Sequence, residues 1–306
     1  MTVKQNGRYA NGRQRWYCNR CKKSYSWHNN QVTKCNQSIW FTKWITEGYS
    51  VRQLSEQSGH SPSTLKRIIQ RNLLSWPPVF LQGLNASRHL IFDGTFLHRP
   101  VSIVTLMDAV TKTIIAGQYG VSENSMPQLF AFFQPLKQKG LSPISCTIDG
   151  NPHVFKILKE LWPSIIIQRC IVHIQRQGLS WCRRSPKRTD AKHLREIFMQ
   201  SAYIDNHKQK EQFITMVELW EYRFGTRIAT QSEKGKVFSD IKRARSMLIK
   251  AIPNMFHYLD DPHIPKTTNA LEGYYSRLKQ HYRQHRGLSK HKLHNYFNWY
   301  FSLRHK

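Results

Sequence analysis

The sequence predicts an α/β protein in which helices cover both faces of a mixed sheet and an all-helical segment interrupts the sheet domain. Two observations support this fold class. From position 89 onward, short β-rich runs are followed by alternating helical and strand patterns. Between positions 183 and 261, in contrast, the apolar residues have helical spacing throughout. With 306 residues, 40% of them hydrophobic, the chain is long enough for about two domains with a buried core.

The charge of the chain predicts a polyanionic partner. It contains 47 Lys and Arg against 18 Asp and Glu, a formal net charge of +29, and the basic residues are spread over the whole length. DNA or RNA is the commonest partner of such a surface. Nine Trp and 15 Phe argue against a small packing protein of the ribosomal or histone type and for a folded enzyme.

Apolar runs and cysteines bear on where the protein works. No stretch of about 18 apolar residues and no apolar signal-peptide core is found, so we expect an intracellular protein without a membrane partner. The six cysteines are scattered, apart from one close pair, and a disulfide framework is not expected in a reducing compartment.

Residues 1–46 form a basic segment that is similar to part of a zinc ribbon. Cys18 and Cys21, in an aromatic-Cys-x-x-Cys-Lys pattern, are half of a tetrahedral zinc site. Two nearby residues fit the other half poorly in spacing: His28 and Cys35. A Zn²⁺ ion bound by the pair is therefore one interpretation, and a basic hairpin that faces DNA is the other. The arginines that this hairpin would present to DNA are Arg13 and Arg15.

Residues 47–76 have the pattern of a helix-turn-helix DNA-binding domain. Gly59 ends one predicted helix and Ser61-Pro62 begin the next. The apolar residues of the two helices have helical spacing: Val51, Leu54, Leu65, Ile68 and Ile69. A second helix placed in the major groove would present Ser63, Thr64, Lys66, Arg67 and Arg71. A helical hairpin with a solvated basic face is the alternative.

The remaining chain is divided into a sheet domain and an insertion. Residues 77–182 form the first part of the catalytic core, with strands expected at 90–92, 101–107, 113–119, 144–149 and 165–167. Helices are expected at about 125–139, 152–161 and from about 171. Residues 183–261 form a helical insertion, and residues 262–306 resume the core with a helix that carries Glu272.

Three acidic residues stand out in a chain that is so poor in acid. Asp93 and Asp149 each follow an apolar run, and Glu272 lies at a helix start. Carboxylates that converge at strand ends and on a helix can hold two divalent cations, Mg²⁺ or Mn²⁺, for phosphodiester chemistry. Taken singly, Asp93 and Asp149 could be turn residues, and Glu272 could form a capping box with Asn269. Together the three favour a metal site.

Further candidate residues lie near these acids. After Glu272, an apolar helix stripe is predicted from Leu271, Tyr275, Leu278 and Tyr282, and a second face from Glu272, Ser276, Lys279 and Arg283. That second face would suit a phosphate backbone, or it could simply be solvated. Cys170 and His173 could be half of a zinc site, a phosphate contact that also orients a carboxylate, or two core residues.

The order of these parts resembles the Mutator-like bacterial insertion-sequence transposases, a branch of the DDE enzymes with a ribonuclease H-like fold. The matching segments are Phe92-Asp93-Gly94-Thr95, Thr147-Ile148-Asp149-Gly150, Gln168-Arg169-Cys170-Ile171-Val172-His173, Thr268-Asn269-Ala270-Leu271-Glu272-Gly273 and His285-Arg286-Gly287-Leu288. The resemblance implies a ribonuclease H-like mixed sheet and a triad of Asp93, Asp149 and Glu272 that binds two Mg²⁺ or Mn²⁺ ions. It also implies a catalytic role for His173, with Cys170 and Asn269 in support.

The same resemblance implies partners and a reaction. The enzyme would expose a 3′-OH at the ends of an insertion sequence and join it to another strand. It would bind double-stranded DNA, both terminal inverted repeats and target. Lys279, Arg283 and Arg286 are expected among its DNA-binding residues. A homodimer or larger synaptic assembly in the bacterial cytoplasm, at the nucleoid, is expected. The first cysteine pair of the zinc ribbon, expected upstream of Gly7, is absent, which puts zinc binding in doubt.

Two other functions remain open at this stage. A domesticated transposase could act as a DNA-binding regulator through its helix-turn-helix alone, although the three intact acids argue against this. A structure-selective nuclease would use the same metal site without strand transfer, and inverted repeats beside the gene would distinguish it from a transposase.

Overall fold

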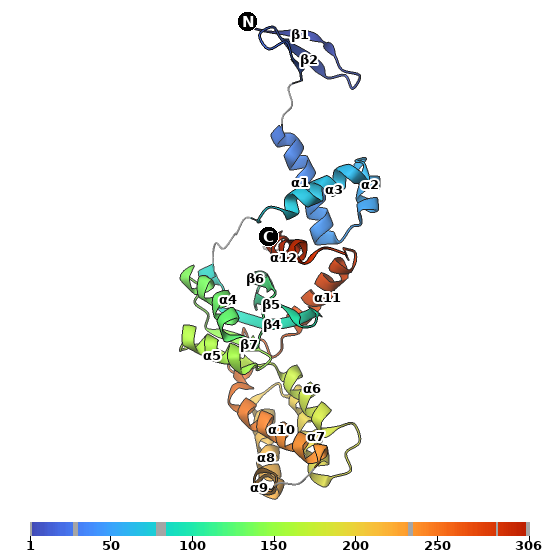
Figure 1. Ribbon diagram of the computed structural model, residues 1–306. Helices are drawn as coiled ribbons and strands as arrows, with labels where there is room; N and C mark the ends of the chain where they lie inside the picture. Colours follow the sequence, from blue (N-terminus) through green and yellow to red (C-terminus); the bar gives the residue numbers. More distant parts are fainter. Residues whose placement is uncertain (1, 27–29, 78–83, 232–234, 286, 304–306) are drawn as a thin grey trace. The chain divides into compact units, whose positions relative to one another are not determined.

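The computed structural model describes residues 2–26, 30–77, 84–231, 235–285 and 287–303, and the chain divides into two compact units, 1–72 and 73–306 (Figure 1). The first unit begins with an antiparallel three-stranded sheet in the order β1 (Val3–Arg8), β2 (Gln14–Cys18) and β3 (Ser24–Tyr25). Three helices follow it: α1 (Asn30–Glu47), α2 (Val51–Ser58) and α3 (Pro62–Leu73).

Helix α1 is not predicted from the sequence, which treats residues 1–46 as one basic segment. The reason is that the apolar residues of α1 do not recur on one face, so the helical period that marks α2 and α3 is missing. Its second half nevertheless buries Phe41, Trp44 and Ile45.

The pair of helices expected from the sequence is present as α2 and α3. A capping box begins α2, with the Ser50 hydroxyl accepting from Gln53 N and the Gln53 side chain accepting from Ser50 N. Gly59 ends the helix at φ 67°, a conformation that favours glycine. Pro62 is the first residue of α3.

A five-stranded mixed sheet forms the centre of the second unit, as the sequence predicts. Its strands are β4 (His89–His98), β5 (Val101–Asp108), β6 (Ile114–Tyr119), β7 (Ser145–Ile148) and β8 (Ile166–Arg169). The order is β6-β5-β4-β7-β8, in which β6, β5 and β4 are antiparallel and β4, β7 and β8 are parallel.

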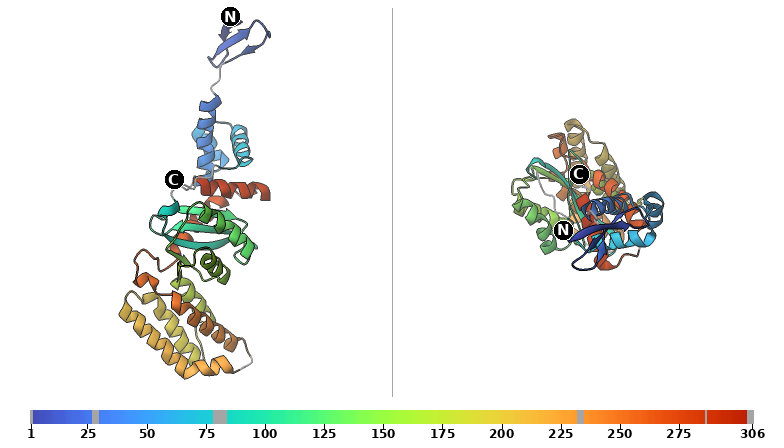
Figure 2. Two further views of the ribbon diagram at one scale, coloured as in Figure 1. Left: turned by 90° about the vertical axis from the view of Figure 1, so that its left-hand side faces the viewer. Right: turned by 90° about the horizontal axis from the view of Figure 1, so that it is seen from above.

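Helices cover both faces of this sheet (Figures 1 and 2). Helices α4 (Met126–Gln138) and α5 (Pro152–Leu161) cover one face, where the Phe92 ring lies 5.0 Å from that of Phe133. Helices α11 (Asn269–Arg283) and α12 (Lys290–Leu303) pack on the other, and a Cβ at Gly117 would lie 2.4 Å from the Phe301 ring. Helix α12 is not predicted from the sequence.

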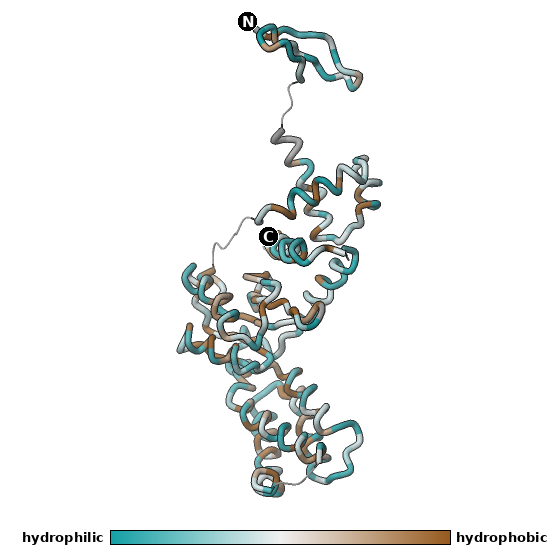
Figure 3. Tube along the Cα trace, in the orientation of Figure 1, coloured by the Kyte–Doolittle hydropathy of each residue, from teal (hydrophilic) through white to brown (hydrophobic). Residues whose placement is uncertain are grey.

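A helical segment with its own core joins β8 to α11. It consists of α6 (Ile171–Cys182), α7 (Thr189–Gln200), α8 (His207–Trp220), α9 (Thr226–Thr230) and α10 (Lys236–Ala251). Short turns complete the unit: η1 (Leu84–Ala86), η2 (Ser201–Tyr203), the π-helical η3 (Glu221–Gly225), η4 (Ile252–Asn254) and η5 (His257–Leu259). Figure 3 shows hydrophobic and hydrophilic stretches alternating along these helices, which is the pattern of helices that bury one face. Within the described ranges, no helix has both the length and the apolar character needed to cross a membrane.

Candidate active site

Asp93 lies inside a strand and not at the strand end that the sequence predicts. Strand β4 continues to His98 because β5 pairs with it along its whole length, with Asp93 opposite Thr105. The parallel pairing with β7 ends much earlier, at Ile91 opposite Thr147. Asp93 therefore extends beyond the parallel part of the sheet, where ligands of such sheets gather, and it is 7% exposed.

Asp149 follows the end of β7, as predicted. Its carboxylate accepts a hydrogen bond of 2.9 Å from Asn151 N, and Asn151, not Asp149, caps α5 by accepting from His153 N. Arg169 packs against Gly150, at φ 103°, and donates to the Asp149 carbonyl oxygen at 3.3 Å. Continuing the register from Ile91 and Thr147 by two residues on each strand brings Asp149 to the level of Asp93.

Glu272 lies in the first turn of α11, and its capping-box interpretation is wrong. Thr268 is the N-cap residue and makes no side-chain capping bond. The Glu272 carboxylate instead lies 3.3 Å from Arg176 Nη1 and 3.8 Å from His173 Nε2. Asn269 is exposed and does not line the cleft described next, so its expected supporting role has no contact there.

An open cleft of about 390 Å³ brings Asp93 and Glu272 together. Its lining residues come from β4, α6 and α11: Asp93, Gly94, Thr95, His173, Glu272, Tyr275, Ser276 and Lys279. Lys279 reaches across it to donate to Thr95 Oγ1 at 2.5 Å. Arg283 is exposed in the last turn of α11, and Arg286 is outside the described residues.

Cys170 and His173 join the start of α6 to the start of α11. Thr268 N lies 3.4 Å from Cys170 Sγ, and Thr268 Oγ1 lies 3.4 Å from His173 Nδ1. The hydrogen bond with Cys170 and the charges of Cys170, Asp93 and Asp149 outweigh burial and raise the pKa of His173 to about 9. In the part of the chain that the structure describes, no third metal-binding side chain joins this pair, which argues against a zinc half-site.

Electrostatics mark the cleft as a place where negative charge is concentrated. Burial, reinforced by the charges of Asp149 and Glu272, raises the pKa of Asp93 to about 7, although His173 and the Gly94 N–H act in the opposite direction. Strongly shifted carboxyl groups in a cleft are typical of functional sites.

Glu123, between β6 and α4, is a fourth acid that the sequence did not reveal. Its carboxylate lies over Gly94, where a Cβ would be 1.6 Å from Glu123 Oε1. Burial, with the charges of Asp149 and Asp93, raises its pKa to about 8. Unlike Asp93 and Asp149, Glu123 sits in a polar run, Ser122-Glu123-Asn124-Ser125, without an apolar strand directly before it. The only local signal is that the acid stands shortly before a helix start.

The DNA-facing residues expected in the first unit are mostly exposed. On α3, Ser63, Lys66, Arg67 and Arg71 are exposed and Thr64 is half-buried, whereas Leu65 and Ile68 are buried. Arg71 also donates to the Gln37 side chain at 2.9 Å. Arg13 is exposed near the tip of the β1–β2 hairpin, while Arg15 is held by Asn6 O at 2.8 Å.

Cys18 and Cys21 lie at the turn between β2 and β3. Hydrogen bonds from the backbone N–H groups of Cys21 and Arg20 and from the Cys21 thiol lower the pKa of Cys18. Cys35 is exposed on α1, and His28 is outside the described residues. Among the residues that are described, no third ligand joins the two thiols, so the structure provides at most half of a zinc site.

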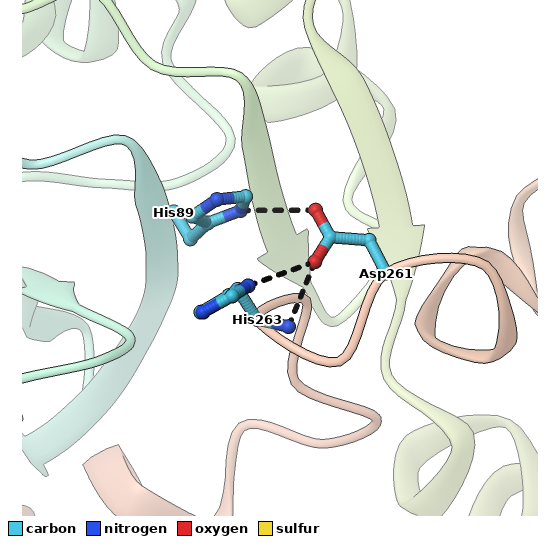
Figure 4. A group of neighbouring side chains, drawn as sticks. All are labelled: His89, Asp261 and His263. Carbon is cyan, nitrogen blue, oxygen red and sulfur yellow. Dashed lines mark hydrogen bonds and ion pairs between the residues drawn. The ribbon is translucent and has the colours of Figure 1, made fainter.

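A separate group of metal-binding residue types lies where β4 begins (Figure 4). His89 Nδ1 is 3.8 Å from one Asp261 carboxylate oxygen and 3.0 Å from Ser145 Oγ, and His263 Nδ1 is 3.1 Å from the other oxygen. The three side chains could hold a divalent cation. They also bind one another without a cation, because both Nδ1 atoms and the His263 N–H lie near the Asp261 carboxylate, and these contacts fasten the 261–263 loop to the sheet.

Comparison with known families agrees with this geometry. The family model described as Transposase, Mutator family, matches residues 93–286, a span that begins at Asp93 and includes Glu123, Asp149, His173 and Glu272. No curated protein matches the chain. The match covers well over half of the sequence, and the chain belongs to the Mutator family of transposases.

Proposed function

We propose that this protein is a DDE transposase that cuts DNA at the ends of an insertion sequence and transfers the exposed 3′ ends to a target. The observation that carries the proposal is that Asp93 and Glu272, from β4 and α11, line one cleft of a Mutator-family chain. Asp149, in the β7–α5 turn, lies close enough to Asp93 for its charge to raise the pKa of Asp93.

The donor set fits two divalent cations such as Mg²⁺ or Mn²⁺. All three ligands offer oxygen, which these ions prefer. Among the described residues, the Asp93 and Asp149 carboxylates accept hydrogen bonds from backbone N–H groups but form no ion pair with Lys or Arg, so oxygen lone pairs remain for a metal. Bound there, the cations would activate the attacking oxygen and stabilise the leaving oxygen of a phosphodiester.

Several residues of the chain would position the triad and the DNA strand. Arg176 and His173 hold the Glu272 carboxylate from one side. Cys170 and Thr268 orient the His173 ring. Lys279 and Ser276 line the cleft side of α11 and would contact phosphates of the bound DNA strand.

We further propose that the core is ribonuclease H-like. Three antiparallel strands followed by two parallel ones, in the order β6-β5-β4-β7-β8, support this assignment. So do the positions of two acids, Asp93 on β4 and Asp149 directly after the neighbouring strand β7. The helical segment between β8 and α11 is proposed to be the insertion expected at 183–261, but it begins earlier, with α6, because Ile171, Ile174 and Cys182 pack in the core of that segment.

The first unit is proposed to bind double-stranded DNA at the terminal inverted repeats. The turn at Gly59 between α2 and α3 and the exposed Lys66 and Arg67 support a helix-turn-helix with α3 as the recognition helix. The net charge of +29 supports binding along an extended DNA surface at the nucleoid. We propose a homodimer or larger synaptic assembly because two element ends must be cut together.

The test is cleavage and joining of a DNA fragment that contains this gene with its flanks, in Mg²⁺ or Mn²⁺. The native chain is compared with Glu272→Gln and with Glu218→Gln, a control at an exposed position on α8. Discrete cuts at the borders of the gene that disappear only in Glu272→Gln are expected. Binding at the borders without any cutting by the native chain would instead support a DNA-binding regulator.

A further inference from the structure

Glu123 places a fourth carboxylate directly against the backbone beside Asp93. A Cβ at position 94 would lie 1.6 Å from Glu123 Oε1 and 2.5 Å from its Cδ. The carboxylate therefore fills the space that any side chain at position 94 would need. Gly94 is in β4, where its φ lies outside the left-handed region, so backbone conformation does not require glycine there.

Asn151 links the Glu123 loop to Asp149. Its side-chain Nδ2 donates to the Glu123 carbonyl oxygen at 3.2 Å, and its backbone N donates to Asp149 Oδ1 at 2.9 Å. Asn151 also caps α5, so its position is fixed by the helix. Glu123 and Asp149 thus share one rigid support, and both lie close enough to Asp93 for their charges to act on each other.

The Glu123 carboxylate has no compensating donor. Within the described ranges, no N–H or O–H donates to it and no Lys or Arg forms an ion pair with it. Burying an unpaired carboxylate is unfavourable, and two neighbouring acids increase the repulsion, which the charge of His173 offsets only in part. A bound cation would give Glu123, Asp93 and Asp149 a common partner.

We propose that Glu123 is a ligand of the divalent-cation site, so that four carboxylates hold the cations of this transposase. The inference rests on the proposed function, since it assumes that the triad binds metal. Four ionised carboxylates would balance the charge of two divalent cations, whereas the triad alone would not. Gly94 is explained by the same arrangement, because it leaves room for the fourth ligand.

Binding of Mn²⁺ alone, without DNA, tests this. The affinity and stoichiometry of Mn²⁺ are measured by calorimetry and electron paramagnetic resonance for the full chain and for Glu123→Gln, Asp93→Asn and Glu160→Gln. Glu160 is exposed on α5 and serves as the matched control. We expect Glu123→Gln to weaken Mn²⁺ binding about tenfold or more, with the control unchanged.

The outcomes separate this inference from the proposed function. If Asp93→Asn loses Mn²⁺ while Glu123→Gln binds it like the native chain, the fourth ligand is rejected and the triad stands. If Asp93→Asn also binds normally, the metal site of the proposed function is rejected. Thermal unfolding in EDTA verifies folding, which the substitution of a neutral amide for a buried carboxylate is not expected to impair.

Gly94→Ala gives a second route that leaves Glu123 in place. The added methyl group must displace the Glu123 carboxylate, so Mn²⁺ affinity should fall. In a Glu123→Gln background the same substitution should have a much smaller effect, because the ligand is already lost. Equal losses in the two backgrounds would show that Gly94 acts independently of Glu123 and would overturn the explanation of Gly94.

Discussion

The Tyr275 phenol donates a hydrogen bond of 2.6 Å to the backbone carbonyl oxygen of Asp93. This bond joins α11 to the middle of β4, two elements that are separated by most of the second unit in sequence. Glu272 lies three residues before Tyr275, about one helical turn away, so the same bond sets the distance between Glu272 and Asp93. The placement of Glu272 relative to Asp93 thus depends on a residue that carries no charge.

Tyr275→Phe should lower cleavage while leaving DNA binding intact. The ring still fills its buried site, but the bond to Asp93 is lost and the free energy of unfolding should fall by about 1 kcal/mol. Because small displacements of reacting groups slow catalysis, we expect a roughly tenfold lower single-turnover rate. Tyr222→Phe, at a site that is 92% exposed, is the control. An unchanged rate in Tyr275→Phe would show that α11 is held by other contacts.

Asp93, Asp149 and Glu272 could be singled out from the sequence because two of them follow apolar runs in a chain that has few acids. The predicted end of the strand at Phe92 was wrong for a physical reason. Strand β4 is extended by its antiparallel partner β5, and a pairing partner that lies later in the chain leaves no signal in the residues of β4 itself. Asp93 and Glu272 nevertheless line one cleft, and the binding of metal by the three acids stays a prediction.

His173→Gln should reduce cleavage without weakening DNA binding. His173 lies 3.8 Å from Glu272, and its positive charge offsets the repulsion among Asp93, Asp149 and Glu123. Glutamine keeps a hydrogen-bonding side chain but cannot carry that charge. We therefore expect the single-turnover cleavage rate to fall by up to about tenfold. His291→Gln, at an exposed position of α12, should cut at the native rate. A native rate in His173→Gln would limit His173 to a structural role.

The position of Glu123 beside Asp93 could not have been predicted, because it arises from tertiary structure. The loop that carries it is polar and short, and such loops usually place acids in solvent. Only the close approach to Gly94, and the fixing of the loop by Asn151, bring the carboxylate into the site. Helix α1 was missed for a different reason, since it lacks the periodic apolar face on which sequence-based recognition of helices depends.

Arg67→Ala should weaken binding to the element ends and lower the salt dependence of the affinity. Arg67 is exposed on α3, and loss of one phosphate contact reduces the slope of log K against log salt concentration by about one. Binding titrations at several salt concentrations measure the slope. Arg52→Ala, on α2, removes an exposed arginine that already pairs with Glu56, and its slope should change less. Equal slopes for Arg67→Ala and the native chain would remove α3 from the interface.

Asp190→Asn should destabilise the helical segment in a pH-dependent way. Asp190 is 2% exposed, and its carboxylate accepts from Arg188 at 2.8 Å and from Arg227 at 3.0 Å. Burial acts to raise its pKa, but hydrogen bonds from Arg188 and Ala191 and the two arginine charges prevail and lower it. A lowered pKa in the folded state stabilises the protein above the ordinary pKa of about 4, and this contribution is lost as the pH falls through the lowered value.

Urea unfolding at pH 7 and at pH 3 measures this contribution. At pH 7 we expect the free energy of unfolding of Asp190→Asn to be about 1.5–3 kcal/mol below that of the native chain, the range for hydrogen bonds to a charged group. At pH 3 we expect this difference in unfolding free energy to be smaller. Asp205→Asn breaks an ion pair with Lys266 in which the aspartate is 75% exposed, so its loss should stay below about 1 kcal/mol. A gap for Asp190→Asn that is equally large at both pH values would mean that the lost stability comes from packing, because an electrostatic contribution must diminish once the carboxylate is protonated.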